Sequence, residues 1–311
     1  LRALRQMLGR IVEIAEPDRH LSLFRGFLRV SSKEETLGEI PLDEIMGVVV
    51  SGHGATHSSN LIVRLSEMGI SFCICGTNFM PTSMLIPIAG NVAQSRRFRI
   101  QSEMSIPRQK QIWATVVKEK IKNQAEALRQ VGQETVAKRL DQIARRVRSG
   151  DPENLEAQAA RFYWPALMGE EFRRRQEEPG PNGLLNYGYT IIRSCMARAT
   201  VGAGLHPTLG IRHKGPTNPM CLVDDFMEPF RPICDLAVNF LLIKDIEEVS
   251  RDAKHALANM TLLELPLAGG SSTLFNAMSD FVLSFIEAAE TGPRSLMVPG
   301  LPSRLSFGGL I

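Results

Sequence analysis

The sequence IWATVVKEKIKNQAEALRQVG, residues 112–132, shows the pattern that dominates most of the chain. Its apolar side chains recur every three to five residues, with Lys, Arg and Glu between them; they are Ile112, Val116, Ile121, Ala125 and Leu128. This spacing places the apolar residues on one face of a helix. It therefore predicts an amphipathic helix that packs against a core.

Helical patterns continue from this stretch to the C-terminus. The run KRLDQIARRVRSGD follows directly. In the next segment Asp151 is expected as the N-cap, Pro152 as the first helical residue and Gly169 as the residue just beyond the end. Similar patterns predict further helices over residues 185–202, 235–257 and 272–290.

The N-terminal part of the chain shows strand-type rather than helix-type sequence patterns. Runs such as HLSLFRGFLRV and ISFCICG are rich in β-branched and apolar residues and are separated by Gly or Pro, which is typical of strands. One helix is expected here, with Ser58 or Ser59 as the N-cap and Gly69 as the terminator. No Gly-rich phosphate loop is present, because SGHGAT lacks the lysine and the spacing of a P-loop.

These patterns predict an α+β protein of two domains. Residues 1–95 are expected to form a small β-rich domain, residues 96–106 a linker, and residues 107–311 a larger all-α domain. The 44% of hydrophobic residues argues against disorder, and no apolar run approaches the roughly 18 residues that span a bilayer. The first twenty residues are too charged for a secretory signal, so we expect a cytoplasmic protein with no membrane contact.

Positive charge is concentrated in one part of the chain. The stretch from Arg96 to Arg148 holds fourteen Lys and Arg against five Asp and Glu, a net +9, while the whole chain carries only +3. Such a stretch is typical of a surface that binds a polyanion, although a solvated helical surface explains it equally well.

Three polar segments lie where a purely structural helix would not need them. Glu156 stands among alanines and aromatic residues in NLEAQAARFYW, and the Gly-rich segment GLHPTLGIRHKGPTN carries His206 and His213. Asp225 and Glu228 are three residues apart in CLVDDFMEPFRPICD, where Pro229 biases Glu228 toward extended backbone. Each signal alone also fits a surface glutamate, a structural histidine or a helix start.

Taken together, these motifs resemble a known family. The runs NLEAQAARFYWPALMG, LLNYGYTIIRSCMARATVGAGLHPTLGIRH and LVDDFMEPFRPICD are similar to the CRISPR-associated adaptation endonuclease/integrase, the spacer-acquisition nuclease, in the branch that accompanies type II systems. LGRIVEIAEPDRHLSLFRGFLRV and RQKQIWATVVKEKIKNQA agree with that branch, so the resemblance covers roughly residues 7–240.

The resemblance implies a metal site and a reaction. The family's ligands fall on Glu156, His213 and Glu228, with Asp225 as an auxiliary acid, whereas His206 does not match a ligand position. Two carboxylates with one imidazole favour Mg²⁺ or Mn²⁺. In this family the 3′-hydroxyl of spacer DNA attacks the CRISPR repeat by transesterification, and water in its place would nick DNA.

The resemblance also implies partners. They are double-stranded DNA, a second copy of the chain bound through the N-terminal domain, and a small ferredoxin-like protein that completes a heterohexamer. A type II effector and an accessory DNA-binding protein are further expected partners. The candidate phosphate contacts are Arg145, Arg146, Arg193, Arg212 and Lys214.

Two other functions stay open at this point. A non-catalytic DNA-binding scaffold would keep the basic surface without the chemistry. An unrelated metallohydrolase acting on small molecules would need no basic stretch and would bind no DNA.

Overall fold

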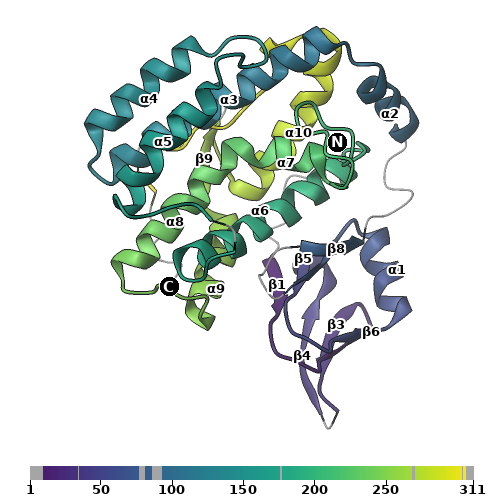
Figure 1. The fold of residues 1–311 in the computed structure, drawn as a ribbon. Coiled ribbons are helices and arrows are strands. Elements are labelled where there is room, and N and C mark those ends of the chain that lie inside the picture. Colours follow the sequence, from purple (N-terminus) through teal and green to yellow (C-terminus); the bar gives the residue numbers. More distant parts are fainter. Residues whose placement is uncertain are drawn as a thin grey trace. The chain divides into compact units, whose positions relative to one another are not determined.

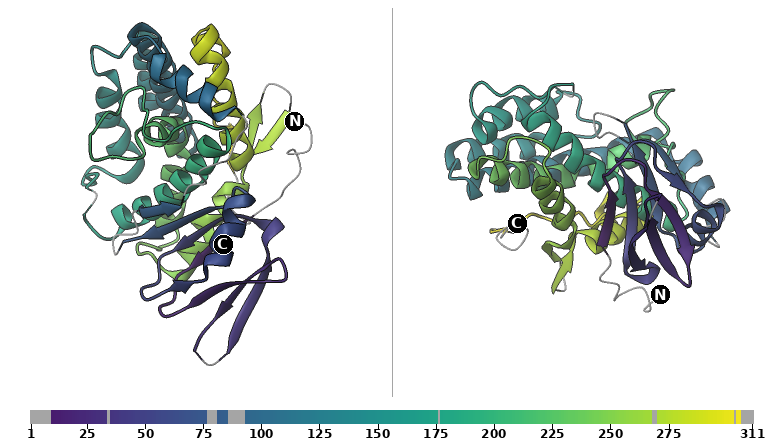
Figure 2. Two further views of the ribbon diagram at one scale, coloured as in Figure 1. Left: turned by 90° about the vertical axis from the view of Figure 1, so that its right-hand side faces the viewer. Right: turned by 90° about the horizontal axis from the view of Figure 1, so that it is seen from below.

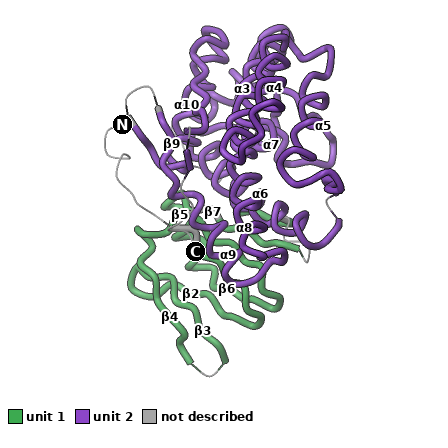
Figure 3. The backbone as a smooth tube through the Cα atoms, turned by 90° about the vertical axis from the view of Figure 1, so that its left-hand side faces the viewer, with its two compact units in different colours: residues 1–90 green, residues 91–311 purple. Residues whose placement is uncertain are grey.

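The computed structural model describes residues 10–33, 35–76, 81–85, 93–175, 177–267, 270–302 and 304–305. The chain divides into two compact units, residues 1–90 and residues 91–311, which Figure 3 shows in different colours. The expected order, a β-rich part followed by a mainly helical part, is confirmed (Figures 1 and 2).

The first unit contains two four-stranded sheets and one helix. One sheet has parallel neighbours except at its last pair, and its order is β1 (Arg10–Ile14), β5 (Ile45–Val50), β7 (Ser71–Cys75) and β8 (Pro81–Leu85). The order of the other is β4 (Thr36–Pro41), β3 (Phe27–Ser31), β2 (His20–Phe24) and β6 (Thr56–His57). A 3-10 turn, η2 (Leu42–Glu44), connects β4 to β5.

Helix α1 (Ser59–Glu67) begins and ends where its sequence predicts. The Ser58 hydroxyl accepts the amide N–H of Leu61, and Gly69 follows the helix at φ +66°. Leu61 packs with alternate strand residues such as Leu21 and Val48 in one buried core. This unit therefore follows directly from period-two and capping patterns.

The second unit is built around helix α6 (Pro181–Gly202), most of whose residues are buried. The helices that surround it are α2 (Gln94–Glu103), α3 (Ile106–Gln130), α4 (Glu134–Arg146), α5 (Leu155–Met168), α7 (Cys221–Met227), α8 (Arg231–Ile243), α9 (Arg251–Asn259) and α10 (Leu274–Thr291). Short 3-10 turns are η3 (Glu228–Phe230), η4 (Met260–Leu262) and η5 (Pro293–Ser295). Helices α3, α4 and α5 pack against one another (Figure 1).

One boundary prediction is wrong. Residues 96–106, expected as a linker, contain most of α2 and the start of α3 and lie in the second unit. That unit is also not entirely helical, since β9 (Glu264–Leu267) and β10 (Gly270–Thr273) form a hairpin. Pro266 in β9 has no amide hydrogen and is unsuited to a helix interior, which favours the extended form.

The predicted start of α5 is also wrong, for an instructive reason. The helix begins at Leu155 rather than Pro152, because Asp151 and Asn154 both adopt positive φ in the preceding turn. The Asp151 carboxylate nevertheless accepts the amides of Leu155 at 2.9 Å and Glu156 at 3.1 Å. It thus supplies the N-terminal cap from four residues away.

None of the described helices combines the length and the apolar character that crossing a membrane requires.

Candidate active site

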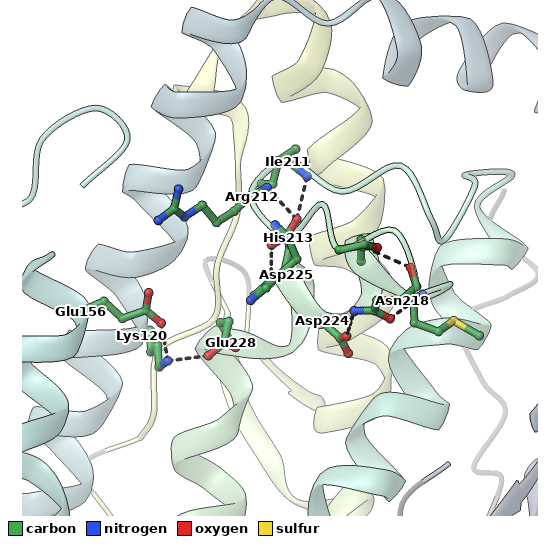
Figure 4. Close-up of polar contacts among 12 residues, drawn as sticks. Lys120, Glu156, Ile211, Arg212, His213, Asn218, Asp224, Asp225 and Glu228 are labelled. Atoms are coloured by element: carbon green, nitrogen blue, oxygen red, sulfur yellow. Dashed lines mark hydrogen bonds and ion pairs between the residues drawn. The ribbon is translucent and has the colours of Figure 1, made fainter. Parts of the chain in front are cut away.

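Two of the three predicted ligands meet at one positive charge. The ammonium of Lys120, on α3, lies 2.6 Å from Oε1 of Glu156 and in direct contact with Oε2 of Glu228 (Figure 4). Glu228 is buried, and Lys120 and Glu156 are partly buried, with 14% and 26% of their side chains exposed. Three helical segments far apart in sequence therefore bring two carboxylates and one cation together.

Each carboxylate is held by its local backbone. Glu156 lies in the first turn of α5, which the Asp151 carboxylate caps. Glu228 has helical φ and ψ of −54° and −46°, so the expected extended bias from Pro229 is wrong here. Pro229 sits in the first turn of η3, where its missing amide hydrogen leaves no hydrogen bond unmade.

Both charges of the buried pair persist at neutral pH. Burial alone would raise the pKa of Glu228, but Arg231 and Lys120 outweigh it and hold that pKa at about 2. Burial would likewise lower the pKa of Lys120, yet Glu228 and Glu156 raise it above its ordinary value. The site therefore holds an ionised Glu228 beside a charged Lys120.

Arg231 supports Glu228 from the other side. Its Nε lies 3.0 Å from Oε1 of Glu228, an ion pair without the angle of a hydrogen bond. Its guanidinium also stands over the Tyr189 ring, 4.6 Å from the centroid. Tyr189 and Tyr163 in turn donate to the buried Asp235. A buried polar network thus fixes the wall behind Glu228.

The histidine loop is organised by Asp225, which is fully buried. Its carboxylate accepts the backbone amides of Ile211 at 2.6 Å, Arg212 at 3.0 Å and His213 at 3.1 Å. Gly210 makes this tight turn possible, because a Cβ at that position would lie 2.3 Å from the carbonyl oxygen of His213. Asp225 therefore shapes the loop, and its role as an auxiliary acid stays a prediction.

Asp225 also orients the imidazole of His213. Nδ1 of His213 lies 2.7 Å from Oδ1 of Asp225, and an ionised carboxylate can only accept, so Nδ1 carries the proton. This hydrogen bond raises the pKa of His213, burial opposes it, and the charges of Asp225 and Glu228 raise it further. In the neutral ring Nε2 then keeps a lone pair, as a metal-binding histidine requires.

The structure thus tests the fit of a divalent ion. An ammonium already occupies the space between two carboxylates, which shows that this space suits a cation. Across the described parts of the chain, no three His, Cys, Asp or Glu side chains form a group arranged to hold a metal. The shared three-ligand site of Glu156, His213 and Glu228 therefore stays a prediction.

The predicted phosphate contacts fall into different surroundings. Arg145 and Arg212 are exposed, and Lys214 donates to Gln109 at 2.9 Å. Arg146 pairs with Glu153 at 2.8 Å on the surface. Arg193 is more buried than these residues, with only 16% of its side chain exposed.

The guanidinium of Arg193 is bound within the protein by Asp224, at 2.7 and 3.0 Å. Arg193 is therefore poorly placed to contact a phosphate. His206 exchanges backbone hydrogen bonds with the Gln101 side chain and packs edge-on against Phe98. These are structural contacts of the His206 backbone and ring.

Sequence reasoning missed the role of Lys120, which it counted only within the basic stretch. Lys120 lies four residues after the buried Val116 and four before the buried Gln124, on one face of α3. A lysine on a buried helix face requires a negative partner, and that spacing is the signal that could have revealed it.

Comparisons with known proteins agree on one family. The family profile "CRISPR associated protein Cas1" matches residues 12–261. A CRISPR-associated endonuclease Cas1 of Neisseria meningitidis is 37% identical over 218 residues, which cover 70% of this chain and 71% of that protein. A CRISPR-associated endonuclease Cas1 of Pyrobaculum aerophilum is 31% identical over 235 residues, which cover 70% and 77%.

Solved structures share the fold. A Cas6-RT-Cas1–Cas2 complex matches at a TM-score of 0.75 and 18% identity, covering 94% of this chain but 36% of that one. A casposase bound to integration product matches at a TM-score of 0.70 and 18% identity, covering 96% of this chain and 93% of that one. A Cas1 protein from Thermotoga maritima matches at a TM-score of 0.72 and 14% identity, covering 90% of this chain and 97% of that one.

Proposed function

Because the chain belongs to the CRISPR-associated Cas1 family, we propose that it is a DNA endonuclease and integrase of CRISPR adaptation. The observation that carries this proposal is the convergence of Glu156 and Glu228 on one positive charge. The similarity to a casposase bound to integration product supports strand transfer as the reaction class.

The proposed reaction exchanges one phosphodiester for another. The 3′-oxygen of the incoming spacer forms a bond to a phosphorus of the CRISPR repeat, and the bond from that phosphorus to the repeat's own 3′-oxygen breaks. The attacking hydroxyl loses a proton and the departing oxygen gains one, so the number of phosphodiesters is unchanged. With water as the attacking group, the same site would nick DNA.

In this proposal Glu156, Glu228 and His213 would hold one Mg²⁺ or Mn²⁺ ion. When bound, the ion would offset the negative charge that develops on the phosphate oxygens. Asp225 keeps the Nδ1 proton of His213 in place, which directs the lone pair of Nε2 outward. Arg231 keeps Glu228 ionised, and Lys120 relieves the repulsion between the two carboxylates before the ion arrives.

The proposal includes an assembly. We expect a homodimer formed through residues 1–95 and a complex with a small ferredoxin-like protein and double-stranded DNA. Its support is that the similar solved structures include Cas1–Cas2 complexes. Light scattering of the purified chain, alone and with that partner, measures both assemblies.

The catalytic proposal is tested with Glu156→Gln. We expect strand transfer of a labelled DNA end with Mn²⁺ to fall at least about 100-fold, while DNA binding without metal changes less than about twofold. Glu171→Gln, on the surface after α5, is the matched control and should retain activity. Full activity of the Glu156 variant would overturn the ligand assignment, and a wild-type chain that binds DNA without any metal-dependent cleavage would favour the scaffold function.

A further inference from the structure

A cavity of about 460 Å³ lies between α4 and α5, outside the carboxylate site. We call it the α4–α5 pocket. Its polar and aromatic lining comes from both helices and consists of Arg139, Gln142, Arg146, Gln158, Arg161 and Phe162. This volume falls within the range of small-ligand clefts.

The charge of the pocket is one-sided. Three guanidinium groups line it and no carboxylate does. Arg146 pairs with Glu153 at the surface, but in the described parts of the chain no carboxylate lies within ion-pairing distance of Arg139 or Arg161. Uncompensated arginines around a hollow favour an anion, and planar guanidinium groups match phosphate oxygens well.

An aromatic surface lies beside these charges. The guanidinium of Arg139 stands 3.5 Å from the centroid of the Phe162 ring, and both groups line the pocket. A planar base can stack on such a pair, and the amides of Gln142 and Gln158 can donate to or accept from its edge. The lining therefore suits a phosphate with a base attached better than a bare phosphate ion.

The pocket does not belong to the carboxylate site. Gln158, Arg161 and Phe162 lie roughly 140–240° around the α5 axis from Glu156, since each residue advances the helix by about 100°. A phosphate bound there is on the far side of α5 from Glu156. It cannot be the phosphate that reacts.

We propose that the α4–α5 pocket binds a nucleotide of a DNA strand away from the reacting phosphodiester. Arg139, Arg146 and Arg161 hold its phosphate, and the Arg139–Phe162 pair stacks on its base. The identity of the anion as DNA rests on the proposed function, but the pocket requires no metal and no chemistry. It would anchor a single-stranded segment and so help to position the DNA.

The test measures binding of a fluorescent single-stranded oligonucleotide by anisotropy in EDTA, so that catalysis is not involved. Arg139→Gln/Arg161→Gln should weaken binding at least about tenfold and reduce the slope of log K against log salt by about 0.7, the value for one phosphate of a single strand. Phe162→Leu leaves the charge unchanged and should weaken binding about fivefold or more. Arg251→Gln/Arg294→Gln removes two exposed charges elsewhere and is the matched control.

The outcomes separate the possible ligands. If the pocket variants weaken binding no more than the control, the pocket does not bind DNA. If inorganic phosphate protects the wild-type chain but not the pocket variants from thermal unfolding, and the pocket variants still bind the oligonucleotide as the control does, the ligand is a free phosphate and the DNA assignment is overturned. If the pocket variants bind DNA as the control does but Glu156→Gln loses strand transfer, the pocket proposal is wrong and the proposed function stands.

Discussion

Replacing Asp225 by Asn is the sharpest test of how the histidine loop is built. The carboxylate accepts four hydrogen bonds, two at each oxygen, from three amides and the imidazole. Asn has nearly the same shape, but one oxygen becomes an amide nitrogen that cannot accept, so two bonds are lost. Hydrogen bonds to a charged group contribute about 1.5–3 kcal/mol each, so we expect a loss of about 3 kcal/mol in the free energy of unfolding.

Urea unfolding followed by tryptophan fluorescence measures this loss in the second unit, because both tryptophans, Trp113 and Trp164, lie there. The same variant should return the pKa of His213 toward its ordinary value near 6.5, which a histidine NMR titration detects. The sign of the pH effect follows. The wild-type contribution of the protonated His213 is complete below about pH 6.5 and is lost as the pH rises through its raised pKa.

Asp224→Asn is the control, because Asp224 pairs with Arg193 and accepts none of the loop amides. It should lower the pKa of His213 less than Asp225→Asn does, because the charge of Asp224 is the smallest of the contributions that raise it, after the hydrogen bond and charge of Asp225. A loss below about 1 kcal/mol for Asp225→Asn, with the pKa of His213 still raised, would refute the reasoning that Asp225 organises this loop.

Three further changes probe the same unit. Gly210→Ala should destabilise by about 1–3 kcal/mol in urea, because its Cβ meets the carbonyl oxygen of His213; an unchanged midpoint would contradict that contact. Asp151→Ala should lower the free energy of unfolding by about 1–2 kcal/mol, because the cap of α5 is lost. Asp151→Asn should lower it less, since Asn keeps one acceptor for the cap and tolerates positive φ. Equal losses for the two variants would argue against capping. Lys120→Met should lower the thermal midpoint measured without metal, because Glu156 and Glu228 then lack the cation they share. Adding Mn²⁺ should raise the midpoint of this variant more than that of the wild-type chain. An equal rise in both chains would oppose a shared cation site.

In the candidate site, the sequence predicted the residues but not the contacts between them. Glu156, His213, Asp225 and Glu228 stand out in the sequence as polar residues in apolar or Gly-rich runs, and the family resemblance implies their roles. Their contacts were not visible. Lys120 lies 36 residues before Glu156 and 108 before Glu228, and no local rule pairs residues across such separations.

Local errors have local causes. Asp151 carries the expected capping chemistry but acts from four residues before the helix, since the turn over residues 151–154 contains two positive-φ positions. Glu228 is helical although a proline follows, because packing of α7 and α8 outweighs a backbone preference of modest size. In both places the residue type was right and the geometry was set by its surroundings.

Local sequence patterns are enough to predict the order of the β-rich and helical parts, most helix positions and the residues able to carry chemistry. Periodicity and capping act over a few residues, so they can be read without the fold. Three contacts follow from the folded chain alone. Lys120 joins Glu156 to Glu228. Asp225 holds the His213 loop, and Asp224 binds Arg193. Electrostatic contacts depend on distance in space and on burial, and chain folding sets both.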